Sequence, residues 1–150
     1  MLDKNGKEIK AGDIVKVSGA YFKKDNGLYF VEQDGTNEAY MSHDEITIYK
    51  INRNGKISTG KYNLNFFPLN HYCSDRRKNA EAYEHDKKHC TIEIVDGVDR
   101  TEVLERFENE VCQSEESAEW YEIRGYGEDF YINLRKKADY FRRAIANMTA

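Results

Sequence analysis

The sequence predicts an α+β protein: a small antiparallel β-barrel with one inserted helix, followed by a pair of C-terminal helices. Short alternating apolar runs, separated by turns rich in Gly and Asn, fill the first part of the 150-residue chain. A charged stretch over residues 74–89 contains neither Gly nor Pro. After residue 99 the apolar residues recur at helical spacing. We therefore expect residues 1–96 to form the barrel domain and residues 97–150 to form a helical extension packed on it.

The barrel is predicted to open with strands at residues 14–18 and 28–33. The run Ile14-Val15-Lys16-Val17 is typical of a strand, and the turn Asp25-Asn26-Gly27 precedes the second one. Residues 46–51 are rich in β-branched and aromatic side chains, which favours a third strand. The Asn-Gly pair at 54–55 is a strong hairpin signal, so a fourth strand is expected directly after it.

The inserted helix is predicted over residues 74–89, with Ser74 as its N-cap, and the last strand follows at 91–95. The helical extension is predicted to begin with a helix capped by Asp99 or Thr101. A second helical stretch is expected at 118–123 and a last helix at 128–147. The break between these two is Gly125-Tyr126-Gly127.

Composition indicates a cytoplasmic protein. The first ten residues have no apolar core segment, so they do not resemble a secretory signal. No apolar run approaches the roughly 20 residues that a membrane span needs. The three cysteines, Cys73, Cys90 and Cys112, are an odd number and are expected to be reduced thiols. No motif implies a cofactor, and we expect none.

Charge is unevenly distributed along the chain. Residues 46–80 hold seven basic groups and one acidic group, whereas residues 81–130 hold five basic and sixteen acidic groups. Residues 131–150 are basic again, with five basic groups and one acidic group. Such a pattern can steer association with charged partners. Alternatively, the charges only form solvated faces that compensate one another.

The residues of the first two strands resemble the KOW motif. The matching features are Gly12-Asp13, the alternating Val15 and Val17, Gly19, the aromatic-basic tip at 21–24, and Gly27 before Leu28. This motif opens small Src-homology-type barrels in ribosomal proteins and transcription factors. Such barrels bind RNA, DNA or proteins, so the resemblance implies binding rather than catalysis.

A broader resemblance covers residues 1–95. The strings GAYFKKDNGLYFV, NGKISTGKYN, FFPL, SDRRKNAEA and HCTIEIV are similar to those in small bacteriophage and mobile-element proteins that have no assigned activity. The resemblance implies a cytoplasmic protein that acts on the machinery of a host or of the element.

Basic and aromatic residues form the first candidate binding surface. Rings can stack on unpaired bases and cations can track phosphates, which is the chemistry of single-strand binding. Alternatively, the rings pack under the barrel rim and the lysines only keep the protein soluble. The candidate residues are Tyr21, Phe22, Lys23, Lys24, Tyr49, Lys50, Arg53, Lys56, Arg76 and Arg77.

Histidines spaced four apart form a candidate metal site. His85 and His89 share one side of the predicted helix, and Cys73 or His71 could complete a tetrahedral zinc site. The sequence has neither a CxxC knuckle nor an HExxH motif, so exposed histidines on a charged helix are the alternative.

Acidic residues of the helical extension form a candidate protein-binding face. A dense acidic face can mimic nucleic-acid phosphates and occupy a basic groove on a partner, or it can be a solvated helix face stabilised by i,i+4 pairs. The candidate residues are Glu102, Glu105, Glu108, Glu115, Glu116 and Glu119.

No catalytic motif is present: the chain lacks a P-loop and a GxSxG elbow. We therefore predict a non-enzymatic binding protein of the phage or mobile-element type that docks on nucleic acid or a nucleoprotein. The alternative is an inhibitor of a host defence system, similar to an anti-CRISPR protein, that binds a host protein through the acidic face. A metal-dependent enzyme is a third, weaker hypothesis.

Overall fold

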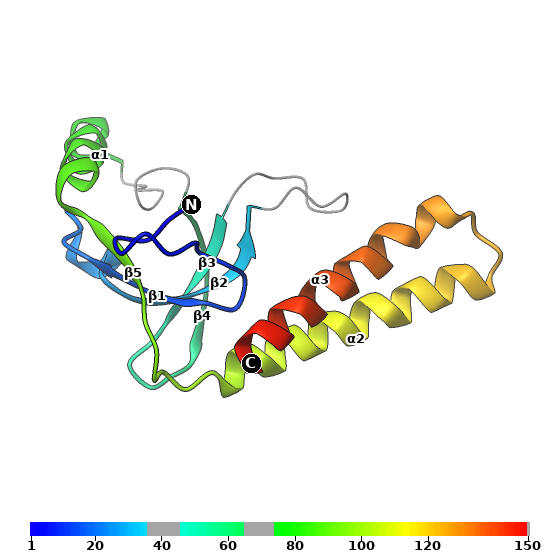
Figure 1. The fold of residues 1–150 in the computed structure, drawn as a ribbon. Helices are drawn as coiled ribbons and strands as arrows, with labels where there is room; N and C mark the ends of the chain where they lie inside the picture. Colours follow the sequence, from blue (N-terminus) through cyan, green and yellow to red (C-terminus); the bar gives the residue numbers. More distant parts are fainter. Residues whose placement is uncertain (36–45, 65–73, 150) are drawn as a thin grey trace. The chain divides into compact units, whose positions relative to one another are not determined.

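The computed structural model describes residues 1–35, 46–64 and 74–149 (Figure 1). Within these residues the fold is α+β, with one five-stranded antiparallel sheet and three α-helices. The described residues divide into two compact units. The first unit comprises residues 1–35, 46–64 and 74–99, and the second comprises residues 100–149.

The sheet of the first unit is open. Its strands are β1 (Ile14–Ser18), β2 (Gly27–Asp34), β3 (Ile46–Ile51), β4 (Ile57–Asn63) and β5 (Thr91–Ile94). They follow the order β4-β3-β2-β1-β5, and every neighbouring pair is antiparallel. A barrel requires the first and last strands of this order to pair. Since β4 and β5 stand at opposite ends of the order, the predicted barrel is not confirmed in the described strands.

Apolar side chains fill both faces of the central strands. Successive side chains of a strand point to opposite faces, which explains why β2 carries a continuous apolar run. Tyr29 is fully buried in the main core cluster with Val15, Val17 and Ile48. Phe30, its neighbour, is fully buried on the opposite face. The hydroxyl of Tyr29 donates to a backbone carbonyl 2.6 Å away, and burial raises its pKa.

An N-terminal turn is fastened to the outer side of β5. Asp3 is buried, and its Oδ1 accepts hydrogen bonds from the backbone N–H groups of Asn5 and Lys7, both at 2.9 Å. Its Oδ2 accepts from the N–H of Ile94 at 2.9 Å. The N–H of Lys4 donates to the carbonyl of Ile92 at 2.8 Å. The hydrogen bonds that the Asp3 carboxylate accepts from the N–H groups of Ile94, Lys7 and Asn5 lower its pKa, and the bond from Ile94 contributes most.

Helix α1 (Arg76–His89) lies between β4 and β5 in the chain, as predicted for the inserted helix. Its N-cap is Asp75, whose Oδ1 accepts from the N–H groups of Arg77 at 2.9 Å and Lys78 at 3.3 Å. The prediction of Ser74 as the cap is therefore wrong by one residue. The carboxylate of Asp75 is the better acceptor for the first exposed N–H groups of the helix.

The second unit is a hairpin of α2 (Thr101–Ile123) and α3 (Ile132–Thr149), which lie side by side (Figure 1). Phe107 and Phe141 pack between them with ring centroids 5.2 Å apart, and small buried residues such as Ala118 and Ala138 allow close approach. Helix α2 is continuous, so the prediction of two separate helical stretches is wrong. The predicted caps are wrong as well, because Arg100 is the N-cap and makes no side-chain capping hydrogen bond. None of the described helices is both long and apolar enough to cross a membrane.

A Schellman turn ends α2. Gly125 has a φ of +77°, and its N–H donates to the carbonyl of Glu122 at 3.1 Å. The N–H of Tyr126 donates to the carbonyl of Tyr121 at 3.1 Å. This pair of bonds, with an apolar contact between the same two tyrosines, is the usual way in which a glycine stops a helix. The short 3-10 turn η2 (Glu128–Phe130) then leads into α3.

Candidate functional site

The register of the sheet places two basic loops at one end. Strand β2 begins where β1 and β3 end, since Gly27 pairs with Val17 and Leu28 pairs with Ile51. The loop at 19–26 and the turn at 52–56 therefore leave the same end of the sheet. The ammonium group of Lys50 also donates to the carbonyl of Lys24, which joins β3 to the first loop. We call this cationic surface the basic loop end; its residues are Lys23, Lys24, Lys50, Arg53 and Lys56.

Tyr21, one of two aromatic residues in the first loop, is fixed against α1. The N–H of Tyr21 donates to Oδ1 of buried Asp86 at 2.9 Å, and its hydroxyl donates to Glu81 at 3.2 Å. Its ring meets those of Phe22 and His85 edge-on, at centroid distances of 5.1 and 5.7 Å. Because 38% of Tyr21 is still exposed, the loop presents a ring whose position is already set.

Gly19 allows the loop to approach α1 this closely. Its φ of +75° lies in the left-handed region that favours glycine. A Cβ at this position would stand 2.4 Å from the carbonyl oxygen of His89. The loop is closed further by the N–H of Ala20, which donates to Oδ1 of Asn26 at 2.9 Å. The glycine that matched the KOW pattern thus has a packing role in this chain.

Most cations of the basic loop end face solvent. Lys23, Lys24, Arg53 and Lys56 are exposed. The ammonium of Lys24 lies 5.9 Å from the ring centroid of Phe22. The half-buried Lys50 places its ammonium 6.0 Å from the ring centroid of Tyr29. These ring contacts orient the two ammonium groups and leave their positive charge in place.

Two further lysines join this end, and the sequence did not predict them. Thr91 at the start of β5 pairs with Ser18 at the end of β1, so the last turn of α1 arrives at the same end of the sheet. That turn carries exposed Lys87 and Lys88. Lys87 is partly neutralised by Glu84, 3.8 Å away. The pairing of β5 with β1 is a long-range contact, and no local pattern in the sequence reports it.

Three of the predicted binding residues lie elsewhere in the first unit. Tyr49 is next to Lys50 in β3 and therefore points to the opposite face, where it stacks on Phe30 with centroids 5.4 Å apart. Arg76 and Arg77 occupy the first turn of α1. His85, which contacts the first loop at Gly19, follows Arg77 by eight residues, and this spacing corresponds to about 12 Å along a helix. The arginines therefore do not belong to the basic loop end.

The two histidines of the candidate metal site lie close together, and His85 contacts the first loop. The rings of His85 and His89 have centroids 4.9 Å apart, and Nε2 of His85 lies 3.0 Å from the carbonyl of Gly19. Over residues 1–35, 46–64 and 74–149, no cluster of three or more His, Cys, Asp or Glu side chains is arranged to hold a metal ion. Cys73 and His71 lie outside the described residues.

Cys90, directly after α1, is a poor candidate for a nucleophile or a thiolate ligand. Burial raises the pKa of this thiol to about 12, and the negative charges of Asp86 and Asp25 contribute to the shift. The thiol therefore stays protonated at neutral pH.

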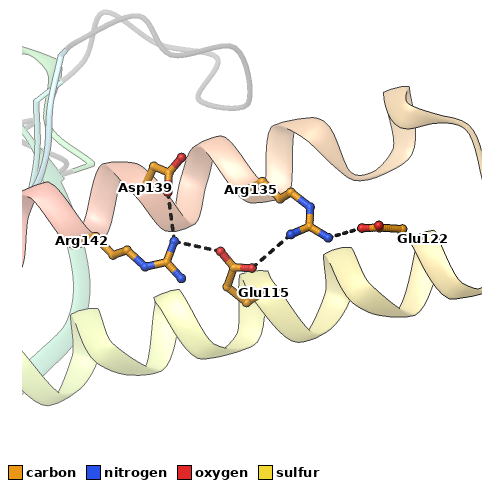
Figure 2. A network of polar contacts seen from close by, with 5 residues as sticks. All are labelled: Glu115, Glu122, Arg135, Asp139 and Arg142. Carbon is orange, nitrogen blue, oxygen red and sulfur yellow. Dashed lines mark hydrogen bonds and ion pairs between the residues drawn. The ribbon is translucent and has the colours of Figure 1, made fainter.

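The acidic face of α2 is partly neutralised within the hairpin (Figure 2). Glu115 is the centre of this network: it lies 2.9 Å from Arg142 and 3.6 Å from Arg135. Arg135 also pairs with Glu122, and Arg142 lies 3.0 Å from Asp139. The bond to Glu115 is the main reason why the pKa of Arg142 is raised.

The other predicted acidic residues face solvent. Glu102, Glu105, Glu108, Glu116 and Glu119 are exposed on α2. The acidic face is therefore divided between residues that hold α3 and residues that are exposed to solvent. Binding of a host defence protein through this face stays a prediction.

No protein-family model matches this sequence, and comparisons with curated proteins and with solved structures found no match. The chemistry of the described surfaces is therefore the basis for a functional proposal.

Proposed function

We propose that this protein is a non-enzymatic binding module that holds single-stranded nucleic acid at the basic loop end. The observation that carries the proposal is the register of the sheet, which brings five cations to the same end of the sheet as the fixed, exposed ring of Tyr21. The resemblance of residues 12–30 to the KOW motif supports a binding role of this kind. In the same way it supports a relationship of the sheet to Src-homology-type barrels.

Each part of the surface has a definite task in this proposal. The exposed ammonium and guanidinium groups contact phosphates, which sets affinity and makes it depend on salt. Tyr21 stacks on an unpaired base, a contact worth roughly 1–3 kcal/mol for a base on an aromatic ring. Because α1 already fixes Tyr21, little conformational entropy is lost when the base arrives.

The proposal is tested by fluorescence anisotropy with a labelled, unstructured single-stranded oligonucleotide, in DNA and RNA forms, across a salt series. The double variant Lys23→Ala/Lys24→Ala is expected to bind about tenfold more weakly. The slope of log affinity against log salt is expected to fall by about 1.4, or 0.7 for each lost phosphate contact. Tyr21→Ala should also weaken binding, whereas Tyr21→Phe keeps the ring and should retain it.

The double variant Lys7→Ala/Lys10→Ala is the matched control. It removes the same charge from exposed residues of the N-terminal segment, which precedes β1 rather than following it. We expect its affinity to stay close to that of the unmodified protein. Absence of salt-dependent binding, or equal weakening by the two double variants, contradicts the proposed interface.

A further inference from the structure

The end of the helical hairpin carries an exposed group of large apolar side chains. We call it the aromatic tip; it consists of Trp120, Ile123, Tyr126 and Phe130, which are 45%, 72%, 43% and 56% exposed. Single exposed apolar residues are common on protein surfaces, but several in contact with one another usually mark an interaction site.

The aromatic tip is held in one arrangement by its own contacts. Half-buried Tyr121 is at its centre, with ring centroids 5.0 Å from Trp120, 5.2 Å from Tyr126 and 6.0 Å from Phe130. Tyr126 and Phe130 also meet edge-on at 5.0 Å. The surface is therefore largely formed before any partner arrives, which lowers the entropic cost of binding.

The turn between the helices does not account for all of these side chains. The Schellman turn needs Gly125 and the apolar contact of Tyr126 with Tyr121. Ile123 is the most exposed of the four tip residues and takes no part in that contact. Phe130, although it touches Tyr121, keeps more than half of its surface in solvent. Exposure on this scale stabilises the hairpin little and offers apolar area to a partner.

The stretch of sequence that contains the tip is mainly acidic. Residues 116–130 contain five acidic residues and one basic residue, Arg124. The guanidinium of Arg124 lies 4.0 Å from the ring centroid of Trp120 and donates to its carbonyl at 3.2 Å. The ring of Trp120 thus already accepts a guanidinium group on its face, a contact favoured by the ring quadrupole.

Two cavities adjoin the tip along α2. One, of about 380 Å³, is lined by Glu116, Ser117, Trp120 and Tyr121. The other, of about 790 Å³, lies against the ion-pair network of Figure 2, and its lining combines apolar Val111 and Ile123 with acidic residues and with Arg135 and Arg142 of that network. The smaller cavity therefore has an apolar and acidic lining, whereas the larger one also contains two arginines.

We propose that the aromatic tip is a docking site for a basic, amphipathic protein segment, with aliphatic side chains on the aromatic rings and Lys or Arg side chains on the carboxylates of this stretch. Charge complementarity selects this partner, because the acidic residues repel the phosphates of nucleic acids and of anionic membranes. This site belongs to the second unit and is independent of the basic loop end.

The experiment uses the fluorescence of Trp120, the only tryptophan in the chain. A synthetic helical peptide of Leu, Lys and Arg is titrated into the full-length protein, and a second peptide with Glu at each basic position serves as the comparison. We expect the basic peptide to shift the Trp120 emission to shorter wavelength, with an affinity that falls as salt rises. The acidic peptide is expected to leave the emission unchanged.

The variant Ile123→Ser/Phe130→Ser keeps Trp120 as the reporter and should weaken peptide binding by about tenfold or more, as for central apolar residues of an interface. Ile123→Ser alone is a milder variant, since most of that side chain is already exposed. Tyr83→Ser is the matched control, because Tyr83 is 40% exposed on α1 in the first unit. It should leave peptide affinity unchanged.

Four results overturn the proposal. These are no emission shift with the basic peptide, an equal shift with both peptides, and peptide affinity unaffected by the Ile123 and Phe130 substitutions. The fourth is an emission shift caused by an oligonucleotide or by raising the concentration of the protein alone, which would assign the tip to nucleic acid or to a second copy of the chain.

Discussion

Substitution of Gly19 by alanine tests whether the first loop is held by its close approach to α1. Two effects act at this position. A residue with a Cβ is strained at a φ of +75°, at a cost of about 1–2 kcal/mol. The new methyl group would also stand 2.4 Å from the carbonyl oxygen of His89, whereas close C···O contacts are about 3.3–3.6 Å.

The second effect requires the loop and the end of α1 to separate by about 1 Å. The contact would join a rigidly attached Cβ to a backbone carbonyl, so no flexible side chain can move aside, and overpacking of this kind costs about 1–3 kcal/mol. The free energy of unfolding of Gly19→Ala is therefore expected to fall by about 2–5 kcal/mol.

Gly97→Ala separates the two effects. Gly97 has a φ of +76°, but a Cβ there meets no atom of the described residues within 4 Å. Both substitutions restrict the unfolded chain equally, so that contribution cancels in the comparison. Gly97→Ala should lose only the 1–2 kcal/mol of backbone strain.

Equilibrium urea unfolding followed by far-ultraviolet circular dichroism measures both losses, and the m-value should stay constant. The displaced loop should also weaken oligonucleotide binding by Gly19→Ala and not by Gly97→Ala. Equal free-energy losses in the two variants would refute the reasoning, because they would show that the contact with His89 costs nothing.

Two further predictions follow from shifted pKa values. The pKa of Asp3 is lowered in the folded protein, so its contribution to stability is complete above its unfolded pKa near 3.9 and is lost as the pH falls further. The stability difference between the unmodified protein and Asp3→Asn, measured by urea unfolding, should therefore shrink from pH 7 to pH 3, and a constant difference would contradict this account. Cys90 is half-buried with a pKa of about 12, whereas Cys112 is exposed, so iodoacetamide at pH 8 should label Cys112 first. Peptide mass spectrometry measures the two labelling rates. Equal rates would contradict the raised pKa of Cys90.

Local patterns in the sequence predicted the elements well. Alternation at 14–17, the Asn-Gly pair at 54–55 and the continuous charged run at 74–89 correspond to β1, to the β3–β4 turn and to α1, which begins at Arg76. Each of these signals acts over a few residues, so it can be recognised without knowledge of the tertiary structure. The prediction of two separate helical stretches within α2 was wrong. Several residues of modest helix propensity do not end a helix that packs against α3 along its length.

The candidate site was predicted in part. The loops at 19–26 and 52–56 share one end of the sheet because each connects two neighbouring antiparallel strands, β1 to β2 and β3 to β4. The order of the strands along the chain is enough to suggest this arrangement. The contribution of Lys87 and Lys88 depends on β5 pairing with β1, 73 residues apart at Thr91 and Ser18. The pairing of Glu115 with Arg135 and Arg142 depends on the alignment of α2 with α3. Such long-range registers are not encoded in any short stretch of sequence.

The N-terminal turn also covers the free edge of the sheet at β5. An edge strand presents unpaired N–H and C=O groups that can recruit a strand from another molecule. In β5, the outward carbonyl of Ile92 is bonded by Lys4 and the outward N–H of Ile94 by the carboxylate of Asp3. A few residues of turn thus occupy the positions that an incoming strand would use. Any change that detaches this turn would convert β5 into a template for aggregation.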